Sequence, residues 1–118
     1  MLSIYYDRTG TPAVYSEDGV HLFSFSGHAL GYIEKDSVYA YTGRHLGWIE
    51  DGWIRDHAGE GVFFADDATG GPEKPVRSPV PLRKVKHVKP KKQVRQLKPV
   101  KTMKTRTWSR TGGDAFFR

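Results

Sequence analysis

The sequence predicts an all-β fold, in which four β-hairpin repeats surround a pseudo-four-fold axis and an extended basic tail follows them. Three observations predict it. A unit of about sixteen residues recurs four times in the first 68 residues, the tail has an apolar period of three, and acidic and basic residues are divided between these parts. We expect a head at 1–68, a Gly/Pro linker at 69–75, a basic tail at 76–107 and an aromatic C-terminal segment at 108–118.

The repeat in the head is aligned on four glycines, which are 17, 16 and 16 residues apart: Gly10, Gly27, Gly43 and Gly59. An apolar residue or tyrosine stands five residues before each glycine, and an alanine, leucine or valine stands three residues after it. An aromatic residue follows each glycine by five positions and a carboxylate by seven; these sets are Tyr15, Tyr32, Trp48 and Phe64, and Glu17, Glu34, Glu50 and Asp66. This agreement indicates four copies of one structural unit.

Each copy contains two turn signals, a central Thr-Gly type and an Asp-Gly type at its end. The short runs between these turns are rich in Tyr, Phe, Val, Ile and Trp, which is typical of strands, and two strands per copy form a hairpin. Closing the hairpins into a ring removes the edges that an open sheet leaves unpaired. We therefore expect eight strands in a closed ring, with the equivalent aromatic residues meeting in the middle.

The tail has a different period. From residue 76, apolar or proline residues stand at every third position except at Lys91: Val76, Pro79, Leu82, Val85, Val88, Val94, Leu97, Val100 and Met103. Only a polyproline II helix, with three residues per turn, places such a series in one stripe. Residues 76–103 would then extend about 84 Å at ~3.1 Å per residue. We expect an extended polyproline-II-like rod or a disordered chain that lies outside the globule.

Charge is divided unevenly along the chain. Residues 1–68 hold four Lys/Arg and eleven Asp/Glu, a net charge of −7, whereas residues 69–118 hold fifteen and two, a net charge of +13. The chain has no cysteine, which excludes disulfides and thiolate metal sites. No apolar run approaches the ~18 residues of a membrane span, and the N-terminus lacks the pattern of a signal peptide. We expect a cytoplasmic protein without a membrane interaction.

Three sets of side chains in the head are candidate sites. In a closed ring, the aligned carboxylates Glu17, Glu34, Glu50 and Asp66 either hold a cation, receive a lysine from the tail, or are solvated beside acidic turns. Carboxylates that face one another raise each other's pKa. The aligned aromatics are core residues or a cage for a cationic ligand. His28, His45 and His57 stand at unequal offsets, so we expect turn histidines, no metal and no cofactor.

Parts of the head resemble a known family. The segments IYYDRTG, YAYTGRHLGWIEDGWIRDHAGE and ATGG resemble the four-fold β-flower proteins over residues 3–71, most specifically at GRHLGWIEDG. The likeness extends loosely to tail triplets with proline and to the Trp-Ser and aromatic residues near the C-terminus. The resemblance implies four β-hairpins around a pseudo-four-fold axis and brings no established activity. The tail departs from the family pattern because it has more lysine and less proline.

We expect a structural or protein-interaction module whose tail mediates assembly or docking. The expected contact residues are the apolar stripe and the terminal aromatics: Val85, Val88, Val94, Leu97, Val100, Met103, Trp108, Phe116 and Phe117. These aromatics anchor either a partner or the head itself.

Two other functions remain open. One is binding of nucleic-acid phosphates through the cations of the tail: Lys84, Lys86, Lys89, Lys91, Lys92, Arg95, Lys98, Lys101 and Lys104. The other is binding of a small ligand or glycan in repeated aromatic pockets. The sequence lacks a cysteine nucleophile, a serine elbow and a phosphate-binding glycine loop, so we expect no enzymatic activity.

Overall fold

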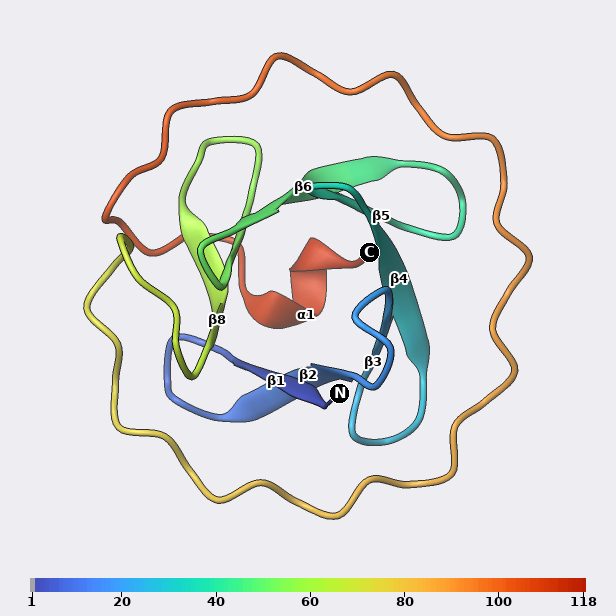
Figure 1. Cartoon of the computed structure of the whole chain (residues 1–118), viewed down its shortest axis with the longest axis horizontal. Helices are drawn as coiled ribbons and strands as arrows, with labels where there is room; N and C mark the ends of the chain where they lie inside the picture. The colour runs from blue at the N-terminus through green and yellow to red at the C-terminus, as the bar shows by residue number, and fades with distance from the viewer. Residues whose placement is uncertain (1) are drawn as a thin grey trace.

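The computed structural model describes residues 2–118. Eight antiparallel strands form a closed barrel in sequence order, and β1 pairs with β8 to complete it (Figure 1). The strands are β1 (Ser3–Tyr6), β2 (Pro12–Ser16), β3 (His21–Phe23), β4 (Ala29–Glu34), β5 (Ser37–Tyr39), β6 (His45–Glu50), β7 (Trp53–Arg55) and β8 (Gly61–Ala65). The predicted all-β, four-hairpin architecture is confirmed.

The four hairpins share their turn geometry. The aligned glycines all have positive φ, between 79° and 98°, a conformation that L side chains rarely adopt. In each turn the glycine N–H donates to the carbonyl oxygen three residues earlier, at 2.9–3.0 Å. The register of every hairpin then shifts at the same place, as between Tyr5 and Tyr6 or between Leu22 and Phe23. The repeated sequence therefore produces a repeated turn and bulge.

The centre of the barrel is mostly aliphatic. The residues five positions before each aligned glycine pack there together with Leu46 and Val62. The aligned aromatics do not meet in the middle, so that expectation is wrong. Tyr5 pairs with Val14, and both face the axis, whereas the next residue, Tyr15, lies on the opposite face of the strand. This alternation places the aromatics between neighbouring hairpins, where Tyr15 packs against Phe23.

The tail wraps around its own head as a ring of extended chain (Figure 1). Residues 74–109, which we call the belt, contain no helix or strand. The molecule measures 36 × 35 × 24 Å, with a radius of gyration of 13.3 Å, so the expected free rod outside the globule is wrong. A 36-residue belt at ~3.1 Å per residue spans about 110 Å, which equals the circumference of a disc about 35 Å across.

The C-terminal aromatics return to the head. Trp108 forms a bridge with Gly61 and lies against Trp53, with ring centroids 5.2 Å apart. The short helix α1 (Gly113–Phe116) lies near the barrel axis (Figure 1), and Phe116, 5% exposed, packs on Phe63. Phe117 stacks on the same ring. These aromatics were expected to anchor either a partner or the head itself. They anchor the chain to its own barrel, so the expectation that they bind a partner is wrong.

Candidate functional site

The belt contains a nine-residue repeat that fits the four hairpins. Its copies are KPVRSPVPL, RKVKHVKPK, KQVRQLKPV and KTMKTRTWS. The third residue of each copy places its carbonyl oxygen against one aligned glycine, where a Cβ would lie 1.9–2.2 Å from that oxygen. The fifth residue donates its N–H to the carbonyl oxygen of the same glycine, as His87 does to Gly27 at 2.8 Å. Each glycine is therefore needed for its turn and for contact with the belt.

The belt lies on a set of aromatic rings and carboxylates of the head, which we call the track: Tyr6, Tyr15, Phe23, Tyr32, Tyr39, Glu17, Glu34, Glu50 and Asp66. We call each place where the belt crosses between two neighbouring hairpins a junction. At the junction that contains Glu17, the Arg83 guanidinium lies 5.4 Å from the Tyr15 ring centroid and bonds to the Glu17 carboxylate at 2.9 Å. Lys86 Nζ lies 5.3 Å from the Phe23 ring centroid and also pairs with Glu17. Two cations three residues apart thus share one carboxylate between two rings.

The next junction repeats this arrangement nine residues later. Lys92 Nζ lies 4.5 Å from the Tyr32 ring centroid, and the Arg95 guanidinium lies 5.6 Å from that of Tyr39. Arg95 also pairs with Glu34 at 3.5 Å. A cation near an aromatic face and a carboxylate gains electrostatic energy from both. The recurrence indicates that the belt and the head match each other unit by unit.

The two remaining junctions have the same kind of ion pairs but differ in their contacts between cations and aromatic rings. Lys101 and Lys104 both bond to Glu50, at 2.7 and 3.1 Å, and reach the acidic turns at Asp36 and Asp51 at 3.0 and 3.2 Å. Arg77 pairs with Asp66 and lies over the Tyr6 ring, with its guanidinium 5.8 Å from the centroid. All four aligned carboxylates therefore receive cations from the tail.

The carboxylates do not face one another, so the mutual repulsion expected of an inward ring is absent among them. Instead, the bond from Lys86 holds the pKa of Glu17 below its ordinary value, and bonds from Lys101 and Lys104 do the same for the pKa of Glu50. The same pairs raise the pKa of each of these lysines. Their charges favour a closed belt at neutral pH.

The junction around Trp48 departs from the other three. The residue four positions before the aligned glycine is Arg55 here, whereas it is Tyr6, Phe23 or Tyr39 in the other copies. Arg55 is 3% exposed, and its guanidinium donates to the carbonyl oxygens of Gly59 and Thr105 at 2.7 Å. Arg55 therefore ties a hairpin turn and the belt together through a buried guanidinium.

Two histidines complete this junction. His45 is 2% exposed, and its Nδ1 lies 2.9 Å from Nε2 of His57, so one ring donates to the other. Burial lowers the pKa of His45, and the charges of His57 and Lys98 lower it further. The expectation of a turn histidine is wrong for His45, which begins β6 and lies in the interior. Within residues 2–118, no three metal-ligating side chains gather in one place.

The apolar stripe of the belt faces solvent. Eight side chains, which we call the rim stripe, are 86–95% exposed: Val76, Leu82, Val85, Val88, Val94, Leu97, Val100 and Met103. The cations of the belt alternate with these apolar side chains, and the cations that contact the track point toward the head. Lys84, Lys89, Lys91 and Lys98 are exposed and make no ion pair within the described part of the chain. The cations proposed to bind nucleic acid thus divide into paired and unpaired sets.

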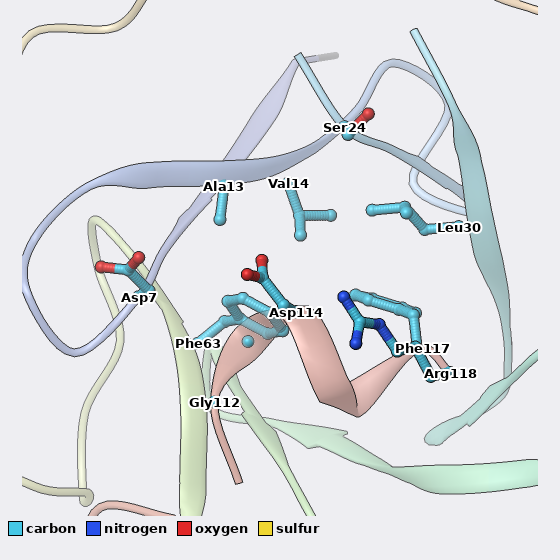
Figure 2. A pocket seen from close by; sticks show the side chains of 11 residues that line it. Asp7, Ala13, Val14, Ser24, Leu30, Phe63, Gly112, Asp114, Phe117 and Arg118 are labelled. Atoms are coloured by element: carbon cyan, nitrogen blue, oxygen red, sulfur yellow. The ribbon is translucent and has the colours of Figure 1, made fainter. Parts of the chain in front are cut away.

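The repeated aromatics do not form open pockets, because Tyr15, Tyr32, Trp48 and Phe64 are 0–3% exposed. The cations over the track rings belong to the belt, and a solvent-facing aromatic cage is therefore wrong. A cavity of about 320 Å³ instead lies beside α1, with an apolar floor that includes Val14, Leu30 and Phe63 (Figure 2). Asp114 and Arg118 point toward it from the C-terminal segment.

The nine-residue repeat of the belt is present in the sequence, beneath the shorter apolar period. The three-residue apolar period obscured it, because one nine-residue unit contains three steps of that shorter period. The cations at 74, 83, 92 and 101, and those at 77, 86, 95 and 104, carry the longer period. The prolines at 81, 90 and 99 repeat it as well. Counting charges rather than apolar residues would have revealed four belt units for four hairpins.

No helix within residues 2–118 has the length and apolar character needed to cross a membrane.

Comparison with known proteins agrees with this architecture. Searches of the curated proteins and of the solved structures returned no match to the chain. The family model described as 4-fold beta flower protein matches residues 3–117, which includes the belt and α1 as well as the head. The chain therefore belongs to the four-fold β-flower family.

Proposed function

We propose that the chain is a non-enzymatic structural and protein-interaction module that docks through its rim stripe. The observation that carries this proposal is the combination of eight apolar side chains at 86–95% exposure with a backbone that is fixed to the head. Large apolar patches on a protein surface mark interaction sites. A disordered linker would not hold its apolar residues in one register, and this belt does.

The shape of the rim supports contact between copies at their edges. The stripe runs around a disc that is 24 Å thick along its shortest axis, so a flat partner covers one arc of it at a time. Burial of apolar surface contributes ~25 cal/mol per Å², and the arc with Val85, Val88, Val94 and Leu97 supplies four neighbouring side chains. Because the rim is convex, two copies that meet edge to edge bring together the few stripe side chains nearest the point of contact, and the flanking lysines remain in water.

The test replaces Val85, Val88, Val94 and Leu97 by serine in the full chain. The contacts of the belt with the aligned glycines use main-chain atoms, so these changes leave the belt in place. Light scattering over a concentration series should show oligomers of the unsubstituted chain and single chains of the variant. Replacing Lys84, Lys89 and Lys91 by serine is the matched control and should keep the assembly. Equal masses for the unsubstituted chain and the apolar variant contradict the proposal.

Phosphate-backbone binding of nucleic acid is the second candidate. It is favoured by Lys84, Lys89 and Lys91, which make no ion pair among the described residues. Binding should weaken with salt by about 0.9 in log K per log unit for each phosphate contacted. A filter-binding series should show this slope for the unsubstituted chain and a shallower one after Lys84→Gln, Lys89→Gln and Lys91→Gln. No retention at low salt excludes this candidate.

A further inference from the structure

The track recognises a simple chemical pattern. Each complete unit offers two aromatic faces with one carboxylate between them, and the cations that fill it are three residues apart, as Arg83 and Lys86 are around Glu17. The next unit is filled nine residues later by Lys92 and Arg95. The track therefore selects an extended segment with cations at intervals of three and nine residues.

Main-chain contacts add a second requirement. Lys84 and Gln93 donate their N–H groups to the carbonyl oxygens of Phe25 and Tyr41, at 3.0 and 2.9 Å. The carbonyl oxygen of Val85 lies where a Cβ of Gly27 would stand, so the ligand backbone must come into contact with the glycine turn. These contacts require an extended chain but no particular side chain at the positions that face solvent. The site thus discriminates by conformation and by the spacing of charge.

The contacts at these two junctions do not depend on the covalent link between the belt and the head. The link is the short segment 67–73, which contains Gly70 at φ 76° and Gly71. Its effect is to raise the effective concentration of the belt near its own track to the order of millimolar. A belt from another copy carries the same sequence and can make the same contacts, which is the condition for exchange of an element between protomers.

We propose that the track is a binding site for an extended basic peptide, and that its occupant from outside the chain is the belt of a second copy. In the exchanged pair each head is encircled by the partner's belt, and the ion pairs and cation–ring contacts are the same as within one chain. This proposal concerns the inward side of the belt and does not rest on docking through the rim stripe.

The test uses two full-length variants with opposite charge reversals. The head variant carries Glu17→Lys and Glu34→Lys, and the belt variant carries Arg83→Glu, Lys86→Glu and Arg95→Glu. Alone, each variant places like charges at two junctions, so its own belt fits poorly. Mixed in equal amounts, each head meets a partner belt of opposite charge. Light scattering should report single chains for each variant and twice that mass for the mixture, with a return toward single chains at about 1 M salt, where exposed pairs are screened.

A chain with all five reversals is the matched control, since its belt again matches its head, and it should remain a single chain. Circular dichroism checks that the variants keep the β signal of the unsubstituted chain. A mixture that stays at the single-chain mass while both variants are folded overturns the proposal. If either variant fails to fold, the reduced pair Glu17→Lys and Arg83→Glu with Lys86→Glu tests one junction by the same measurement. All of these chains also carry Val85→Ser, Val88→Ser, Val94→Ser and Leu97→Ser, which remove edge-to-edge contact through the rim stripe, so the change in mass reports the exchange of belts alone.

Discussion

The head and the belt are both built from four repeats, but they use apolar residues in opposite ways. In the head, Leu22, Val38 and Ile54 are 0% exposed and pack around the axis. In the belt, Val88, Leu97 and their equivalents are exposed, and main-chain hydrogen bonds and ion pairs attach the segment. The difference shows that a periodic apolar pattern predicts a common face of a segment without predicting that this face is buried.

The largest expected effect comes from truncating one apolar side chain in each region. Ile54→Ala removes a fully buried side chain from the barrel centre and should lower the free energy of unfolding by ~2–5 kcal/mol. Leu97→Ala removes part of a side chain that is 95% exposed in the single chain, and at concentrations too low for assembly it should change the free energy of unfolding by less than ~0.5 kcal/mol. Urea unfolding measures both. A large loss at Leu97 would show that the rim stripe is covered in solution.

An intermediate effect is expected from two glycines that differ in their contact with the belt. Gly19 and Gly43 have φ of 75° and 92°, so alanine is strained at either position by ~1–2 kcal/mol. A Cβ at Gly19 meets nothing within 4 Å, whereas one at Gly43 would lie 1.9 Å from the carbonyl oxygen of Val94. Gly43→Ala should therefore cost a further ~1–3 kcal/mol and expose the belt to proteolysis near Lys92. Equal losses for the two variants in urea unfolding would mean that the belt contact contributes little.

The smallest effect is expected from acid. Because the folded-state pKa of Glu17, Asp36 and Glu50 is lowered by their lysine partners, these pairs stabilise the fold above the ordinary carboxylate pKa. That contribution is lost as pH falls through and below about 4. Small-angle scattering should show the radius of gyration rising above 13.3 Å as the belt detaches, before the β signal is lost. Detachment that starts only with global unfolding would contradict this order. The chain with Glu17→Gln and Glu50→Gln should show a weaker pH dependence.

Much of the head could be predicted from sequence because its constraints are local. The glycines at positive φ, the short aromatic and β-branched runs and the four-fold alignment determine eight strands within neighbouring residues. The inward or outward direction of the aligned aromatics could not be predicted in this way. It depends on the bulge after Tyr5, which shifts the pairing and places Tyr15 on the outer face.

The belt could be predicted as an extended chain but not as a wrapped one. Its three-residue period identified one common face, and its charge opposed that of the head. Placing it required knowing that nine extended residues cover the same arc as one sixteen-residue hairpin, which is a property of the closed barrel. The contact between the buried His45 and the exposed His57 depended likewise on neighbouring hairpins, so their unequal offsets in sequence did not identify a site.

The seam between β1 and β8 has a consequence for biosynthesis. All eight strands lie before residue 66, so the barrel has every strand it needs while the belt is still being translated. Synthesis proceeds at ~5–20 residues per second, so the last strand is made seconds before the end of the belt. A head that closed in that interval would expose its acidic track to other extended basic segments until the belt arrived.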